Sequence, residues 1–255
     1  MAIGRFRKHV AEHDWFAALV DVGIVVLGVF LGLQVNNWNQ GRLDRAEARG
    51  NREMLIDDLQ SNQNNLAMRK HYYQWVRAEA LKTSAELANP ASSTDEQFLI
   101  DSYQASQILP WSLKKNTYDH ITTGGAIEHI GDAALRDQIT NYYVGADVTG
   151  ANLVTVPPYR EALRRAMPYA AQSRIRTDCG EKIGENRRGE PEMILPGACH
   201  IRLDAATVRQ AARQVRDTPG LALDLNRLLV DLDQKLVSVD VISRRAAILA
   251  RVLKQ

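Results

Sequence analysis

Four side chains form the only local cluster in this sequence that could bind a metal ion or transfer protons: Asp119, His120, Glu128 and His129. Histidine titrates near neutral pH, and carboxylates commonly orient it. The spacing matches no metal motif, and adjacent helical residues point to different faces. We interpret the four as surface residues around a turn at Gly124-Gly125. We therefore predict no catalytic residue, no metal site and no cofactor, with an enzyme site assembled from distant residues as the alternative.

One carboxylate, Asp21, lies in the most apolar stretch of the chain, roughly 9 Å of helix beyond Trp15. A charge at the centre of a membrane span costs about 2.5–3.5 kcal/mol, so such groups usually face protein or water. In one interpretation Asp21 lies near the cytoplasmic headgroups, within reach of water or of Arg5, Arg7 or Lys8. In the other it carries ions or pairs helices. The second arrangement resembles in outline the small subunits of proton-driven stator complexes.

Two cysteines, Cys179 and Cys199, flank a polar loop. An even number of cysteines in an oxidising compartment suggests a disulfide. Closing a loop of about 20 residues is worth roughly 3 kcal/mol in the chain-entropy model. The alternative is a pair of free thiols in a cytosolic domain.

Small residues lie on one face of the apolar stretch. Gly28 and Gly32 form a GxxxG motif, with Gly23 nearby. Such a face lets two helix backbones approach closely and associate. It predicts a homo-oligomer or a subunit of a membrane complex, although glycine is also common in membrane helices that do not associate.

These glycines and Asp21 belong to residues 15–38, which we predict to be a transmembrane helix. From Trp15 to Val35, about 21 residues include only Asp21 and Gln34 as strongly polar side chains, and a helix needs about 20 residues to cross a bilayer. Trp15 and Trp38 would lie at the two headgroup levels, which indoles prefer. No A-x-A-like cleavage site follows the apolar core, which favours an uncleaved anchor in the lipid bilayer.

Arginine and lysine occur on both sides of the anchor, so counting them does not decide its orientation in the membrane. The lengths of the two flanking segments decide it instead. The short tail, residues 1–14, is the more natural cytoplasmic side, because long domains translocate largely regardless of charge. Residues 39–255 then form one periplasmic domain, with the cysteine loop at 179–199. The net charge of +2 and the absence of a dense basic block argue against nucleic acid as a partner.

Two long helices dominate the predicted domain. Residues 39–87 contain no proline and many helix formers, so the anchor is expected to continue into this helix. It has a heptad seam, in which we interpret the polar Asn62 and Arg69 as a solvated face, or as residues that set the register. The C-terminal helix has a second stripe, which needs an antiparallel partner or an oligomer. The first seam is Leu55, Leu59, Asn62, Leu66, Arg69, Tyr73, Val76 and Ala80; the second is Leu225, Leu232, Val239, Ala246 and Leu253, interleaved with Leu229, Leu236, Ser243 and Ala250.

Local signals predict the shorter elements. Ser93 with Glu96 reads as a capping box, and Asp132 and Asp204 as helix caps. Thr218-Pro219 is expected to start the last helix, with proline in its first turn. Residues 193–195 and 200–203 are expected to pair as a short hairpin.

The anchor ending LGVFLGLQVNNWN, together with the later stretch NTYDHITTGGAIEHIGDAALRDQITNYY, resembles a family of uncharacterised bacterial single-pass membrane proteins, classed as a domain of unknown function. The resemblance covers the anchor and the middle third of the chain. It implies a membrane-anchored helical protein of bacterial origin, and brings no activity or site residue.

The predicted fold is therefore all-α: a transmembrane helix continuing into a long helix, with an extracytoplasmic helical bundle and a small disulfide-tied loop. The predicted function is a scaffold or accessory subunit of the bacterial envelope that acts through protein contacts. The alternatives are an ion-coupled, stator-like subunit using Asp21 and an envelope enzyme.

Overall fold

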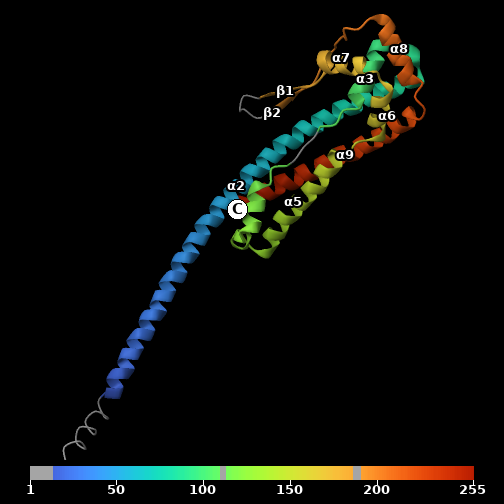
Figure 1. Cartoon of the computed structure of the whole chain (residues 1–255). Helices are drawn as coiled ribbons and strands as arrows, with labels where there is room; N and C mark the ends of the chain where they lie inside the picture. The colour runs from blue at the N-terminus through green and yellow to red at the C-terminus, as the bar shows by residue number, and fades with distance from the viewer. Residues whose placement is uncertain (1–13, 110–112, 186–190) are drawn as a thin grey trace, which may run out of the picture.

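The computed structural model describes residues 14–109, 113–185 and 191–255. The predictions made for Arg5, Arg7 and Lys8 and for the Trp15 side chain lie outside the described part. The chain is mostly helical, as predicted, and two short strands add the one sheet formed by the described residues (Figure 1).

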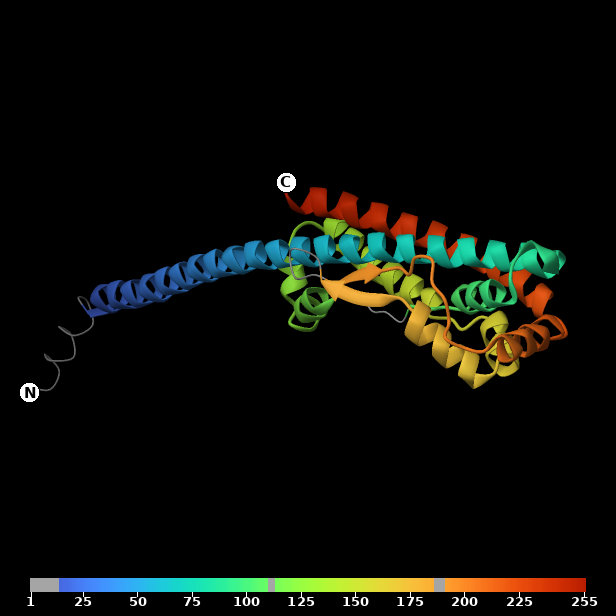
Figure 2. The ribbon, with the colours of Figure 1, turned by 90° about the horizontal axis from the view of Figure 1, so that it is seen from above.

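One helix, α2 (Asp14–Ala88), runs unbroken through the anchor segment and into the domain. Its 75 residues extend over roughly 110 Å at 1.5 Å per residue. From Leu19 to Trp38 the large apolar side chains are exposed, and Ala48 is the first buried residue along the described helix. Figures 1 and 2 show this N-terminal part projecting alone from the domain. The prediction that the anchor continues into the first long helix is confirmed.

The remaining elements fold back along the second part of α2. Besides the single turns η1 (Pro90–Ser92) and η2 (Ala126–His129), they are α3 (Asp95–Ala105), α4 (Asn116–Thr123), α5 (Ala133–Leu153), α6 (Pro158–Ala166), α7 (Tyr169–Cys179), β1 (Lys182–Glu185), β2 (Pro191–Ile194), α8 (Ala205–Arg216) and α9 (Leu221–Leu253).

The long helix α9 packs antiparallel to α2. Lys70 Nζ lies 2.8 Å from Asp240 Oδ1, and Arg77 Nε lies 2.5 Å from Asp233 Oδ1, so positions later in α2 face positions earlier in α9. The C-terminus consequently lies beside α2 where the domain begins (Figure 2). These ion pairs are partly exposed and contribute about 0–1 kcal/mol each, so the pairing depends mainly on the apolar seam between the helices.

Every predicted seam position on α2 is buried, including Asn62 and Arg69. Their interpretation as a solvated face is therefore wrong. Asn62 Nδ2 donates to Lys114 O, and Lys114 N donates to Asn62 Oδ1, both at 2.8 Å. Arg69 Nη1 donates to Leu109 O at 2.9 Å, and burial lowers the pKa of Arg69 to about 9. The two polar side chains fasten the connection between α3 and α4 along α2.

The five heptad positions of α9 are buried, as predicted, but the interleaved positions are shifted. Leu229, Leu236 and Ser243 are only half-buried, whereas the residues just before them, Leu228, Lys235 and Ile242, are buried. Leu228, Lys235 and Ile242 thus form a second buried row. Because its middle residue is a lysine, a search for apolar residues at heptad spacing did not find this row.

Lys235 is buried because its ammonium group closes the end of another helix. Its Nζ donates to Leu153 O at 3.1 Å, where α5 ends, and lies 5.4 Å from the ring centre of Tyr73. The last carbonyls of a helix lack partners within the helix, so a cation there is favourable. Burial lowers the pKa of Lys235.

The caps at Asp132 and Asp204 are confirmed: Asp132 accepts from Leu135 N, and Asp204 from Ala206 N and Thr207 N. The other two predicted helix starts are wrong by one or two residues. Thr94, rather than Ser93, caps α3 by accepting from Gln97 N. The last helix starts at Leu221 after Gly220, whose φ of 78° ends the preceding turn in a conformation that favours glycine.

The predicted hairpin has the wrong partner. Residues 193–194 do lie in a strand, β2, but β2 pairs antiparallel with β1, with Ile183 opposite Met193. Residues 200–203 form no strand. Their backbone is instead bound by side chains of two helices, as described next.

Candidate functional site: a disulfide-tied loop beside an acid pair

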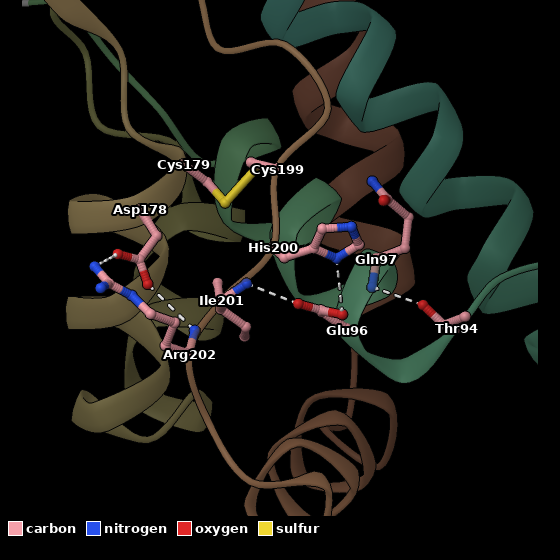
Figure 3. Close-up of polar contacts among 9 residues, drawn as sticks. All are labelled: Thr94, Glu96, Gln97, Asp178, Cys179, Cys199, His200, Ile201 and Arg202. Atoms are coloured by element: carbon pink, nitrogen blue, oxygen red, sulfur yellow. Dashed lines mark hydrogen bonds and ion pairs between the residues drawn. A yellow bond between two sulfur atoms is a disulfide. The ribbon is translucent and has the colours of Figure 1, made fainter.

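A disulfide joins Cys179, the last residue of α7, to Cys199 in the loop before α8 (Figure 3). The two Cα atoms are 5.6 Å apart, and 20 positions separate the residues in sequence. Cys179 is buried and Cys199 half-buried. The predicted disulfide is confirmed.

Two carboxylates hold the backbone that follows Cys199 (Figure 3). Ile201 N donates to Glu96 Oε1 at 2.7 Å, and Arg202 N donates to Asp178 Oδ2 at 3.2 Å. Glu96 lies in the first turn of α3, and Asp178 in the last turn of α7. The loop is thereby fixed to two helices in addition to its covalent link. Glu96, predicted to complete a capping box, binds this loop instead.

The Arg202 side chain strengthens the same contact. Its Nη2 donates to Asp178 Oδ1 at 2.8 Å, and the hydrogen bonds and charge of Arg202 lower the pKa of Asp178. His200 Nδ1 lies 3.4 Å from Glu96 Oε2, but the His200 side chain is 91% exposed. A weak, solvated contact of this kind gives His200 no catalytic environment.

A cavity of about 260 Å³ lies between this loop and the helices α2 and α3. It is lined by Trp75, Glu79, Lys82, Gln97, Ile100, Asp101, Gln104 and the segment 196–199. Gln104 Nε2 donates to Cys179 O at 2.5 Å, so the wall of the cavity is tied to the disulfide.

Two acids, Glu79 and Asp101, line this cavity and influence each other electrostatically. Asp101 on α3 is only 2% exposed and accepts from Gln97 Nε2 at 2.5 Å. Burial is the largest cause that raises the pKa of Asp101, to about 7; the Gln97 hydrogen bond opposes it, and the charge and hydrogen bond of Glu79 add to it. Lys82 Nζ lies 2.9 Å from Glu79 Oε1 and forms an ion pair with it. Asp101 is therefore a carboxyl group that changes its protonation near neutral pH.

A carboxyl group with a pKa near 7 has the acidity that general acid and base catalysis requires. The direct consequence of the pair is a stability that depends on pH.

The structure separates the predicted site residues instead of bringing them together. Asp21, Gly28 and Gly32 lie on the projecting part of α2, where Asp21 is exposed and no heavy atom comes within 4 Å of a Cβ built on either glycine. Cys179 and Cys199 lie beside the far half of the same helix. Nothing in the described chain joins the two regions except α2 itself.

Asp119, His120, Glu128 and His129 lie around the Gly124-Gly125 turn, in α4 and η2. Glu128 Oε2 lies 3.5 Å from Arg136 Nη2, and both histidines are exposed. Within residues 14–109, 113–185 and 191–255, no group of three metal-ligating side chains comes together.

Sequence reasoning missed the acid pair because Glu79 and Asp101 lie on different helices. Each acid alone reads as part of a solvated helix face. One signal was available in the sequence: Asp101 directly follows the apolar run Phe98-Leu99-Ile100, and an acid buried beside such a run must find a partner.

Comparisons of the chain with known protein families, with curated protein sequences and with solved structures found no match.

Proposed function

We propose that this chain is a single-pass protein of the bacterial inner membrane, with its N-terminus in the cytoplasm and its helical domain in the periplasm. We further propose that it acts as a noncatalytic scaffold or accessory subunit, by binding other proteins. The observation that carries the proposal is the continuity of α2, which is apolar and exposed at its start and buried in the domain core from Ala48 onward.

Support for the anchor comes from residues 19–38. This segment is long and apolar enough to cross a bilayer, and none of it is buried against the domain. A long row of exposed Val, Leu, Ile and Phe side chains is costly in water and favourable in lipid. The Cys179–Cys199 disulfide supports the periplasmic side, because disulfides persist in oxidising compartments.

Support for a scaffold comes from the shape of the domain. About ten helical residues, roughly 15 Å, separate Trp38 from the first buried residue, and Ala88 lies roughly 75 Å beyond Trp38 along α2. The antiparallel partner α9 stiffens most of that length. A pair of packed helices fused to an anchor suits a protein that holds a partner at a fixed distance from the membrane.

The anchor offers its own contact surface. Gly28 and Gly32 lie one helical turn apart, and the space beside both is open in the single chain. A second anchor helix could approach this face closely, which is how GxxxG motifs associate in membranes. We place self-association on this face.

We expect leucine at both glycines, G28L/G32L, to reduce cross-linked dimers in native membranes at least fivefold, because the larger side chains keep the backbones apart. V26L/F30L, on the opposite face of the helix, is the matched control and should cross-link like the wild type. An unchanged cross-linking pattern in G28L/G32L would rule out this face.

Mass spectrometry of the intact assembly in mild detergent tests the wider role. A homo-oligomer, or a complex with one co-purifying protein of fixed stoichiometry, supports the scaffold or accessory subunit. A strictly monomeric chain that co-purifies with no other protein after gentle extraction would contradict it.

A further inference from the structure

Three arginines line a second cavity, of about 430 Å³, to which α3, α6 and α7 contribute residues. Arg160 and Arg164 lie one turn apart on α6, and Arg176 lies in the last turn of α7. The rest of the lining is Tyr103, Gln107, Gly180 and Glu181. Three cations and one acid give this lining a net charge of +2.

Among the described residues, the hydrogen bonds that Arg160 and Arg164 donate all go to neutral acceptors, and three of the four are long. Gln107 Oε1 accepts from Arg160 Nη1 and from Arg164 Nη2 at 3.4 Å each. Arg164 Nη1 donates to Gln172 Oε1 at 3.3 Å, and the buried Arg164 Nε has no acceptor in the described part of the chain. The one short bond runs from Arg160 Nη1 to Ser106 O, at 2.5 Å. Charged donors with such weak acceptors would gain from an anionic oxygen.

The arginines are also held in place without an ion pair. None of the three lies in a salt bridge with a described carboxylate, by the distances found in residues 14–109, 113–185 and 191–255. The Arg164 guanidinium lies over the Tyr103 ring, 3.7 Å from its centre. This stacking orients the guanidinium before any ligand arrives.

Acid–base properties of the lining agree with a strong local positive field. Burial lowers the pKa of Arg160, and the nearby charge of Arg164 lowers it further. Burial alone would raise the pKa of Tyr103, but hydrogen bonds and charges from Arg164 and Arg176 outweigh burial and lower it. The effect of Arg164 on Arg160, and the effects of Arg164 and Arg176 on Tyr103, are those expected where positive charge is in excess.

We infer that this cavity binds a phosphate group, either inorganic phosphate or a small soluble phosphate monoester. Guanidinium groups pair with phosphate through parallel hydrogen bonds, and a tetrahedral dianion can accept from several of them at once. A carboxylate offers only two oxygens in one plane. The volume suits a small ligand. The proposed phosphate site is independent of the proposed scaffold role. A failure to bind phosphate would therefore not contradict the scaffold role.

The position of the cavity favours a soluble ligand over a lipid headgroup. The charges of Arg160 and Glu181 act on Tyr72 of α2, so the cavity lies near that residue. Tyr72 is 34 positions beyond Trp38, which corresponds to roughly 50 Å of helix. A headgroup of the anchoring bilayer does not reach so far if α2 stands upright.

The test is calorimetric titration of the full chain in detergent with sodium phosphate, at an ionic strength held constant with chloride. We expect one saturable site per chain. R176Q, which alters an exposed residue of α7 and leaves the core intact, should weaken binding at least tenfold, and R160Q should do the same. R165Q and R174Q remove exposed charges next to the cavity residues in sequence, and should bind phosphate within twofold of the wild type.

Four results would overturn the site. The first is no saturable heat with phosphate; the second is an equal loss in R165Q or R174Q. The third is tighter binding of succinate than of phosphate, which would assign the cavity to dicarboxylates. The fourth is binding of short-chain phosphatidic acid without binding of inorganic phosphate, which would assign it to a lipid headgroup.

Discussion

Replacing Cys179 and Cys199 together by serine is expected to lower the free energy of unfolding of the domain by about 3 kcal/mol. The disulfide closes a loop of 20 positions and so restricts the unfolded chain. It also keeps the segment at 200–202 close to its two carboxylate partners, Glu96 and Asp178. Urea unfolding of the full chain in detergent, followed by circular dichroism, measures the difference.

The matched control for this prediction is a reducing agent. Reduction should destabilise the wild type by a similar amount and leave the double-serine variant unchanged. If the variant is as stable as the oxidised wild type, the loop is held by its hydrogen bonds alone and the disulfide has no structural role.

Replacing Asp101 by asparagine is expected to stabilise the domain at pH 8 by up to about 3 kcal/mol, and to change little at pH 4. The folded-state pKa of Asp101 is raised from 3.8 to about 7, so the folded state binds the proton more tightly than the unfolded state. This contribution to stability is fully present below about pH 4 and is lost as the pH rises through 7. Asparagine mimics the protonated acid, because it carries no charge and its side-chain oxygen can still accept from Gln97 Nε2.

Unfolding free energies of wild type and variant, measured from pH 4 to pH 8, check this sign. The variant should have the flatter profile. Some slope should remain, because burial also raises the pKa of Glu86. Asp137→Asn, at an exposed position on α5, is the control and should shift stability by less than about 0.5 kcal/mol at every pH. A variant that is less stable than the wild type at pH 8 would contradict the raised pKa of Asp101.

The two long helices were predictable because their information is local. An unbroken stretch of helix formers and a seven-residue repeat depend only on residues close in sequence, and both α2 and the first row of α9 follow them. The pairing of cysteines was predictable for a different reason, since only two were present.

Three of the errors have a common physical cause, which is a partner distant in sequence. Lys235 fills an apolar row because the end of α5 needs a cation. Asn62 is buried because it binds the backbone of Lys114. Glu96 does not complete the predicted capping box, because its carboxylate accepts a hydrogen bond from Ile201 N. In each case a polar side chain binds a backbone group that lies far away in the sequence, so local patterns could not reveal the contact.

The acid pair and the arginine cavity were invisible for the same reason. Glu79 meets Asp101 only when α3 folds onto α2, and Arg176 joins Arg160 only when α7 packs beside α6. Asp21 and the Gly28/Gly32 face, by contrast, were found from sequence alone. Their roles stay predictions.

The most direct test of the account is the location of the two parts joined by α2. A phosphatase that is active only in the periplasm, fused after Gln255 in a bacterial host, should be active. The fusion protein should also stay in the membrane fraction after washing with alkaline carbonate. A membrane-bound fusion without phosphatase activity, or a chain released by the wash, would contradict a periplasmic domain carried on a transmembrane helix.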